Sequence, residues 1–432
     1  MATAAYRGEI FHLRGDPAAG AEAIGHHADG LIVVEDGEIA ACGDFVAESQ
    51  RLPDDTAITH YESEMIVPGF VDAHIHFPQV DIIGAYGARL MDWLERYTFP
   101  SEMAFADAAH AAEVAEIFLD ELLRNGTTSA LVFATVHKTS VDALFTAAAA
   151  RNMRLVAGKV LMDRNAPAAL LQSPEQGDRE SRELIRAWHG KGRLGYAVTP
   201  RFAPTSTAEQ LALAGQLMRE HDGLLMQTHL SENPDEICAV AELFPEAHDY
   251  LDVYDRAGLV TDRSVFAHGI HLSDREFGRL GEAGAAIAFC PTSNLFLGSG
   301  LFKLAKSEAS GITVSLGTDV GAGTSFSAFQ TMNEAYKVGQ LAGAGPDAFK
   351  LFYLATLAGA KALKSESRIG NLAPGKEADF LILDPAATPL LKRRMAACTS
   401  LEERLFVLVT LGDDRAVKHT YVAGKLAHSR ED

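Results

Sequence analysis

Cysteine is scarce in this chain and never occurs in closely spaced pairs. The 432 residues include four cysteines, namely Cys42, Cys238, Cys290 and Cys398, and no C-x-x-C motif occurs. Disulfide frameworks and cysteine-based zinc sites both depend on thiols at short, regular spacings. The pattern therefore argues against both kinds of site, and it favours a protein of the reducing cytoplasm.

Long apolar runs are also missing. No uninterrupted apolar stretch approaches the roughly 20 residues that a membrane-spanning helix requires. The first residues, MATAAYRGEIFHLRGDP, lack the basic segment followed by an apolar core that marks a secretory signal peptide. We therefore expect neither a membrane span nor a signal peptide.

Positive charge is in short supply. Lysine and arginine total 38 against 58 acidic residues, which gives a formal net charge of −20. An acidic surface repels phosphate backbones and anionic membrane faces, although solubility alone also accounts for such acidity. We therefore expect no nucleic-acid partner and no membrane partner, so that any nucleobase substrate would be a free base.

What the middle of the chain does contain is an alternation of short apolar segments with amphipathic segments of helical periodicity. This alternation is typical of a parallel α/β sheet, and eight repeats of it predict a (β/α)8 TIM barrel. The eight candidate strands are 65–74, 128–134, 155–161, 196–199, 224–228, 265–268, 285–290 and 313–316.

Both ends of the chain have the pattern of β-structure. Asp36-Gly37 separates two short apolar runs, which is a hairpin signal, and the tail contains similar strand-like runs near 378–384 and 417–424. We expect the two ends to form one small β-sandwich domain. The expected organisation is an N-terminal part of this domain at 1–66, a metal-dependent barrel at 67–372, and its C-terminal part at 373–432.

The barrel hypothesis directs attention to the carboxyl ends of the strands, where barrel enzymes hold their active sites. The first candidate strand runs into His74 and His76. Residues two apart on a strand point to the same side, so both imidazoles can approach one ion. A lone H-x-H is weak evidence for a metal site, but an apolar strand that ends in this motif is stronger.

Three further strand candidates also end in polar residues: His229, His268 and Asp319. Each has an ordinary alternative, because a histidine can be structural and an aspartate at a strand end can make an Asx turn. Glu232 follows His229 by three residues and, taken alone, is better explained as negative charge at a helix start. His271 is better explained as a loop residue.

Taken together, these strand ends predict one metal site. Four separate strand ends present His, His, His and Asp, in an order consistent with strands 1, 5, 6 and 8 of the expected barrel. The fourth candidate strand ends in Thr199-Pro-Arg201, with no lysine that could be carboxylated to bridge a second ion. Imidazole and carboxylate suit zinc and also iron, so a single ion of either kind is expected.

Several motifs resemble those of the amidohydrolase superfamily. They are PGFVDAHIH at 68–76, THLSE at 228–232, HGIHL at 268–272 and GTD at 317–319. More specifically, His76-Phe-Pro-Gln79 followed by LMDWLERYTFPSE at 90–102 is similar to the branch of the superfamily that deaminates guanine. The similarity spans essentially the whole chain, including the closing LAPGKEADF at 372–380.

The resemblance implies an activity, a cofactor and roles for the residues. The activity is hydrolytic deamination of guanine at C2 to xanthine and ammonia. One Zn2+ per chain, Fe2+ being possible, would be bound by His74, His76, His229 and Asp319, and the protein would form a homodimer. Glu232 would shuttle protons, His268 would hydrogen-bond the attacking water, and Asp319 would take part in catalysis. The implied substrate-binding residues are His76, Gln79, Arg201, Phe202, His229, Glu232 and Asp319.

Donor and acceptor patterns fit this implied substrate. Arg201 has only donors, so it suits O6 or N7 of a purine, whereas Gln79 both donates and accepts. Phe202 would stack on the base, but a core aromatic is nearly as good an explanation. Trp93, Tyr97 and Phe99 would cover the pocket or simply form a buried helix face.

Two alternatives to guanine deamination stay open. One is another deaminase or chlorohydrolase of the superfamily, acting on 8-oxoguanine, a triazine or a related heterocycle. The other is a catalytically dead relative that serves as a scaffold, although such proteins typically lose metal ligands and here every ligand is present. The zinc site of cytidine deaminases is excluded, because H-x-E followed by P-C-x-x-C does not occur.

Overall fold

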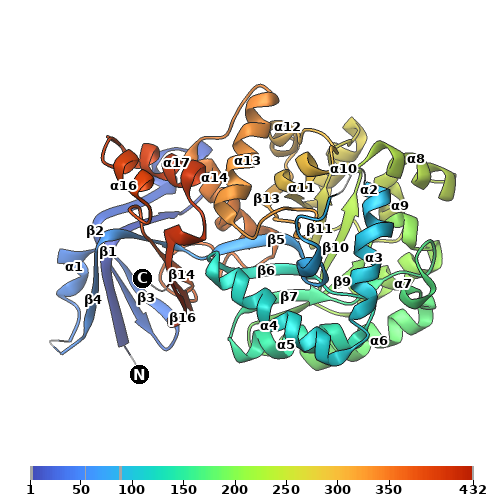
Figure 1. Ribbon diagram of the computed structural model, residues 1–432, viewed down its shortest axis with the longest axis horizontal. Helices are drawn as coiled ribbons and strands as arrows, with labels where there is room; N and C mark the ends of the chain where they lie inside the picture. Colours follow the sequence, from blue (N-terminus) through green and yellow to red (C-terminus); the bar gives the residue numbers. More distant parts are fainter. Residues whose placement is uncertain (1–2, 54, 87–89, 431–432) are drawn as a thin grey trace.

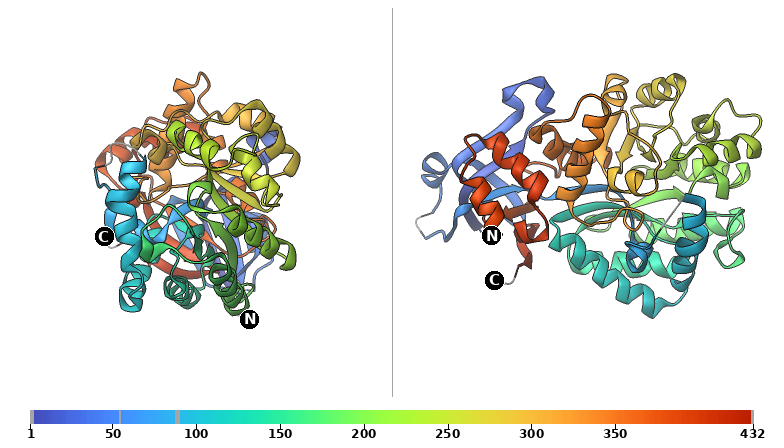
Figure 2. Two further views of the ribbon diagram at one scale, coloured as in Figure 1. Left: turned by 90° about the vertical axis from the view of Figure 1, so that its right-hand side faces the viewer. Right: turned by 45° about the horizontal axis from the view of Figure 1, so that its top comes forward.

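The computed structural model describes residues 3–53, 55–86 and 90–430. Two bodies lie side by side in Figure 1 and again in the right-hand view of Figure 2: a barrel, and a smaller β domain built from both ends of the chain. Along the described residues, no helix is both long enough and apolar enough to cross a membrane.

The barrel is the larger body and contains eight parallel strands paired in chain order. They are β5 (Phe70–His76), β6 (Thr127–Phe133), β7 (Arg154–Gly158), β9 (Leu194–Pro200), β10 (Leu225–Leu230), β11 (Ser264–His268), β12 (Ala286–Phe289) and β13 (Thr313–Leu316). The short β8 (Val160–Leu161) pairs with β9. The Asp319 amide donates to the His74 carbonyl at 2.9 Å, which links the last strand to the first. The predicted (β/α)8 barrel is confirmed.

The first predicted strand, 65–74, is in fact two strands. Residues 65–68 end β4 (Ile58–Pro68) of the terminal sheet, and β5 begins at Phe70. Gly69 makes the transition where a Cβ atom would lie 2.1 Å from Thr128 Oγ1, so only glycine fits. Both halves are apolar and buried, which is why the hydrophobic pattern alone does not show the break.

Amphipathic helices surround the barrel strands. In α4 (Ala108–Arg124) the buried residues recur at spacings of three and four, which is the pattern of a helix with one apolar face. The other barrel helices are α5 (Lys138–Ala150), α6 (Pro174–Trp188), α7 (Ala208–Glu220), α8 (Pro234–Leu243), α9 (Tyr250–Arg256), α10 (Asp274–Ala283), α11 (Pro291–Phe296), α12 (Leu304–Ala309), α13 (Ala328–Leu341), α14 (Ala348–Ala355) and α15 (Leu357–Ala362). Between β5 and α4 the chain forms α2 (Leu90–Trp93), a π-helical turn η4 (Leu94–Thr98) and α3 (Phe99–Ala104).

The terminal domain is one mixed sheet of seven strands in the order β16-β15-β14-β4-β1-β2-β3. Its remaining strands are β1 (Thr3–Leu13), β2 (Ile24–Glu35), β3 (Glu38–Asp44), β14 (Phe380–Leu383), β15 (Val417–Val422) and β16 (Lys425–Ser429). Asp36 and Gly37, with φ of 50° and 89°, form the predicted hairpin turn between β2 and β3. Helix α1 (Phe45–Ser49) follows β3, and α16 (Pro389–Met395) and α17 (Leu401–Leu411) separate β14 from β15.

The seven-stranded sheet curls over its own core. The Ile39 amide at the far edge donates to the Lys376 carbonyl at 2.7 Å, and Ala378 donates to the Gly37 carbonyl at 2.9 Å. Strand β3 therefore meets the segment that leads into β14, and one buried apolar cluster lies between the facing halves. This curled sheet is the form that the predicted β-sandwich takes.

Two arginines join the terminal domain to the barrel. Arg154 begins β7 and Arg193 immediately precedes β9, so both lie at the amino ends of barrel strands. The Nε atom of each donates to Glu377 Oε2 at 2.9 Å, and Arg193 also pairs with Asp379. The terminal domain is therefore attached at the end of the barrel opposite to the carboxyl ends of the strands.

Candidate active site

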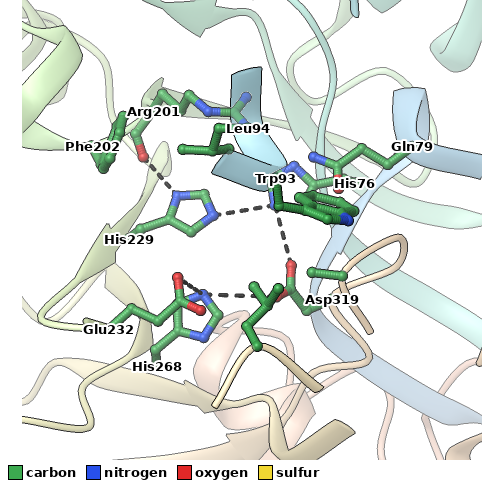
Figure 3. Close-up of a pocket in the computed structure, with 12 residues that line it drawn as sticks. His76, Gln79, Trp93, Leu94, Arg201, Phe202, His229, Glu232, His268 and Asp319 are labelled. Atoms are coloured by element: carbon green, nitrogen blue, oxygen red, sulfur yellow. Dashed lines mark hydrogen bonds and ion pairs between the residues drawn. The ribbon is translucent and has the colours of Figure 1, made fainter. Parts of the chain in front are cut away.

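A cavity opens at the carboxyl ends of the barrel strands. It is drawn in Figure 3, and the residues that line it are His76, Gln79, Trp93, Leu94, Arg201, Phe202, His229, Glu232, His268, Leu297, Asp319 and Ala322. Every substrate-binding and catalytic residue expected from the sequence lies on this wall. His74 is buried beside it.

The four expected ligands form one compact group in the cavity. One ligand-type atom from each of His74, His76, His229 and Asp319 lies within 4.8 Å of the others. The Nε2 atoms of His74 and His76 are 3.1 and 3.3 Å from Asp319 Oδ1, and the Nε2 atoms of His76 and His229 are 3.2 Å apart. The strand ends thus bring together side chains that are up to 245 positions apart, from 74 to 319.

Backbone contacts orient these ligands. His74 and His76 share one side of β5 because they are two residues apart on a strand. Nδ1 of His229 contacts the Arg201 carbonyl at 2.7 Å, which turns its Nε2 toward the group. Asp319 has a φ of 53°, a strained left-handed conformation for a residue other than glycine. The local fold holds this strain in order to present the carboxylate.

The charge states of the group suit a cation. Burial lowers the pKa of His76 to about 4 and lowers that of His229 well below its ordinary value, so both rings are neutral. Burial raises the pKa of Asp319, but the neighbouring His74 and His76 outweigh this and hold it well below its usual range. Neutral imidazoles and an ionised carboxylate are what metal ligation requires.

The donor set also fits a metal in its hydrogen bonding. His74 Nε2 is buried and makes no hydrogen bond, although Asp319 Oδ1 is 3.1 Å away. Leaving a buried nitrogen in this state is costly unless another group satisfies it. Three imidazole nitrogens and one carboxylate oxygen are suitable ligands for a divalent first-row ion. The residues present therefore fit the metal that the sequence motifs imply.

Glu232 and His268 lie beside the ligand group. His268 Nε2 is 3.5 Å from Glu232 Oε2 and 3.8 Å from Asp319 Oδ2, and Figure 3 shows the three side chains facing one another across the cavity. Burial, reinforced by Asp319 and Glu236, raises the pKa of Glu232 well above its ordinary value. Burial lowers the pKa of His268 to about 3. A carboxyl with a raised pKa is thus next to an imidazole with a lowered pKa.

The Glu232 side chain does not cap the start of helix α8. Asn233 is the N-cap of α8, and Glu236 completes the capping box. Glu236 Oε2 accepts the amide hydrogens of Glu232 and Asn233 at 3.0 and 3.2 Å, and Tyr250 donates to Oε1 at 2.6 Å. The Glu232 carboxylate is left to face the cavity, where Ser299 Oγ donates to it at 3.1 Å.

The residues expected to contact the base line the same cavity. Gln79 Oε1 accepts the Gly321 amide at 3.1 Å, and Arg201 Nη1 donates to Glu102 Oε1 at 2.5 Å. Phe202 is 4% exposed and belongs to an apolar cluster with Trp93, so it is both a core aromatic and a wall residue.

The neighbouring aromatics divide between the cavity and its surroundings. Trp93 lines the cavity, whereas Tyr97 and Phe99 pack in the apolar cluster around it. His271 is exposed in a loop, where its Nε2 contacts the Ser299 carbonyl at 2.7 Å.

Four residues that hold the site in place have no role assigned by the sequence patterns. Asp72 joins His74 to the Asp319 loop, Glu102 holds Arg201, Asn294 contacts His268 Nδ1 at 2.9 Å, and Ser299 contacts Glu232. Asp72 had a detectable signal, because it shares a strand side with His74 and His76. The others come from α3, α11 and the loop after α11, where no local pattern marks them.

Comparison with known proteins agrees with this geometry. The model of the amidohydrolase family matches residues 65–427. The chain is 51% identical over 415 residues to the guanine deaminase of Escherichia coli K12, covering 96% of this chain and 94% of that protein. A solved structure of E. coli guanine deaminase superposes with a TM-score of 0.96 at 48% identity, over 100% of both chains.

Another similar structure contains a bound ligand. It is a guanine deaminase structure from C. acetobutylicum with bound guanine in the active site, at 30% identity and a TM-score of 0.89, covering 98% of this chain and 100% of that one. The motifs, the barrel, the ligand group and these matches lead to one conclusion: the chain belongs to the amidohydrolase family, among its guanine deaminases.

Proposed function

We propose that this protein catalyses the hydrolytic deamination of guanine at C2, with xanthine and ammonia as products. One observation carries the proposal: a single cavity combines a three-histidine, one-aspartate ligand group, the buried carboxyl of Glu232, whose pKa is raised, and the donor side chain of Arg201. The similarity to guanine deaminases over nearly the full chain supports guanine as the substrate.

We propose Zn2+ as the ion held by His74, His76, His229 and Asp319. Zinc sites in hydrolases commonly use histidine and carboxylate ligands and keep one position open, although iron accepts the same donors. When bound, such an ion lowers the pKa of water and so supplies a nucleophile at neutral pH.

The side chains around the ligand group position the attacking water. His268 Nε2 has no hydrogen-bond partner and lies between Glu232 and Asp319. From there it can donate to an oxygen placed between these two carboxylates. We propose that His268 and Asp319 orient water for attack on C2 of the purine.

Glu232 is placed to move protons. Because its pKa is raised well above the ordinary value, its carboxyl can deliver a proton to the ring nitrogen next to C2 as the attack proceeds. This transfer prevents negative charge from accumulating on the ring. The ionised carboxylate then takes a proton from the attacking water, and Glu232 or Asp319 passes one to the departing amine as ammonia.

Arg201 and Gln79 provide the recognition of the base. Arg201 presents only donors, so it suits the O6 or N7 acceptors of guanine. Adenine would place an amine donor against that guanidinium and leave buried groups unpaired, at a cost of about 1–3 kcal/mol for each group. Gln79 lines the same cavity, where its Oε1 accepts the Gly321 amide hydrogen.

The decisive experiment incubates the purified protein with guanine and measures the xanthine and ammonia that form. The metal content is measured on the same sample. We expect turnover of guanine and one zinc per chain. A preference for 8-oxoguanine or a triazine over guanine would overturn the substrate assignment, and a metal-loaded but inactive protein would favour the scaffold alternative. The cytoplasmic location and the homodimer stay predictions from the sequence.

A further inference from the structure

Glu102 is a buried carboxylate that lies behind the cavity and does not line it. It is on α3 and has no exposed surface. Its Oε1 accepts from Arg201 Nη1 at 2.5 Å, while its Oε2 is buried without a hydrogen-bond partner. A carboxylate in such a place costs free energy unless a partner compensates it, and the Arg201 guanidinium is that partner.

Arg201 is fixed at both of its ends. Its carbonyl accepts from the His229 ring, so its backbone is tied to a residue of the ligand group. Its guanidinium is tied to Glu102 and lies 5.8 Å from the centre of the Phe99 ring. An arginine side chain loses much rotamer freedom when it is ordered. The pair with Glu102 has already ordered it before a substrate arrives.

Gln79 converges on the same carboxylate. Burial raises the pKa of Glu102, while the charge and the hydrogen bond of Arg201 and, to a smaller extent, Gln79 act to lower it. Figure 3 shows Arg201 and Gln79 on one side of the cavity, with Glu232 and His268 on the other. The Arg201 guanidinium is thus anchored by a carboxylate outside the cavity.

We infer that Glu102 is a specificity-determining positioning residue, which aims the Arg201 guanidinium at the O6 oxygen of the purine without touching the substrate itself. The inference rests on the proposed function. The inference goes beyond that function, because it assigns the discrimination between purines to Arg201 together with the Glu102 carboxylate outside the cavity. Orientation by such an outer partner is how binding sites maintain the geometry of their contacts.

The test compares two purines that differ at the O6 position, which is the edge that we expect Arg201 to face. Guanine is the substrate, and 2-aminopurine, which lacks the O6 acceptor, is measured as a competitive inhibitor. In Glu102→Gln we expect the KM for guanine to rise about tenfold or more. The Ki of 2-aminopurine should change by less than about threefold, and kcat for guanine should stay within about threefold of the wild-type value. Glu95→Gln, an exposed change in the same segment, should leave all three unchanged.

Arg201 variants make the test specific. In an Arg201→Ala background, adding Glu102→Gln should change the KM for guanine by less than about twofold, because the two residues act as one unit. If Glu102→Gln does not fold, the double variant Glu102→Met with Arg201→Met removes both charges at once and leaves no unpaired charge in the core. It should show the same loss of preference for guanine as Arg201→Ala.

The outcomes separate the two proposals. No turnover of guanine by the zinc-loaded wild-type protein would refute the proposed function. Turnover by the wild type, combined with equal losses for guanine and 2-aminopurine in Glu102→Gln, would show a merely structural role and overturn the inference. Additive effects of the Glu102 and Arg201 substitutions would overturn it as well.

Discussion

Asp72 Oδ2 accepts a hydrogen bond from Thr318 Oγ1 at 2.5 Å, across the junction between the first and last barrel strands. The other oxygen of this carboxylate accepts the amide hydrogens of His74 and Thr318, each at 3.1 Å. One buried side chain therefore fixes the relative positions of two segments that carry His74, His76 and Asp319. These hydrogen bonds of Asp72 go to the His74 amide and to Thr318, next to the ligand residues in both segments.

We predict that Asp72→Asn weakens metal binding. The new amide nitrogen would face hydrogen-bond donors of Thr318 or His74, so the two segments would move apart. Loss of an outer partner of metal ligands typically lowers metal affinity by about 10–100-fold. Competition with a chelator measures this affinity, and Asp81→Asn, an exposed change in the segment after β5, is the control. Unaltered zinc affinity would show that the junction holds without Asp72.

Glu232→Gln should bind metal normally and lose nearly all turnover. Glutamine keeps the shape of the side chain but cannot carry a proton between the water and the purine. General acid–base catalysis contributes about 10²–10⁴-fold, so kcat should fall by that range. Steady-state kinetics and metal analysis on the same preparation check both statements. The exposed Glu242→Gln on α8 should behave like the wild type. Full activity of Glu232→Gln would remove the proton-shuttle role.

Asn294→Leu should lower kcat without loss of metal. The amide of Asn294 contacts His268 Nδ1 at 2.9 Å and so determines which ring nitrogen carries the hydrogen. Without this contact, the ring loses the orientation that directs Nε2 toward Glu232 and Asp319. We expect a fall in kcat of about 10–100-fold, as for other outer partners of functional histidines. A similar fall in metal content would instead indicate a general disturbance of the site.

Glu377→Gln should destabilise the attachment of the terminal domain. Burial raises the pKa of Glu377, but Arg154 and Arg193 outweigh burial and the net shift is downward. A lowered folded-state pKa contributes stability above the unfolded value of about 4.3 and loses it as the pH falls further. Thermal unfolding at pH 7 should therefore show a loss of about 3 kcal/mol, the scale of a broken buried pair.

Between about pH 5 and pH 3, the free energy of unfolding should fall less in Glu377→Gln than in the wild type, because the variant has no carboxyl at position 377 to be protonated. Glu113→Gln, an exposed change on α4, serves as the control at both pH values. Equal thermal stability of Glu377→Gln and wild type at pH 7 would show that these ion pairs do not hold the two bodies together.

The barrel and the ligand group could be predicted because their signals are local. Each apolar run ends at the residue that the strand carries to the cavity, as for His76 in β5 and His229 in β10. Periodicity within a run and the residue at its end are both readable without knowledge of distant contacts. The single-metal group followed from adding such local signals together.

The supporting contacts could not be predicted, for a physical reason. Glu102 and Arg201 are 99 positions apart and meet only when α3 packs over the end of β9. The contact between Asn294 and His268 likewise needs the turn after β12 to fold back over β11. The division between β4 and β5 depends on which sheet each segment pairs with. The residues on both sides of Gly69 are apolar, so the hydrophobic pattern does not show where one strand ends and the next begins.

The order of strands in the terminal sheet has a consequence for how the chain folds. Strand β4 pairs with β1 on one side and with β14 on the other, so one edge of β4 has no partner until the last part of the chain is available. Such an edge can pair with another molecule, and pairing between distant segments is slow. During synthesis, the barrel must therefore be largely made while this edge is open. The interval before β14 arrives is when the nascent protein is most exposed to aggregation.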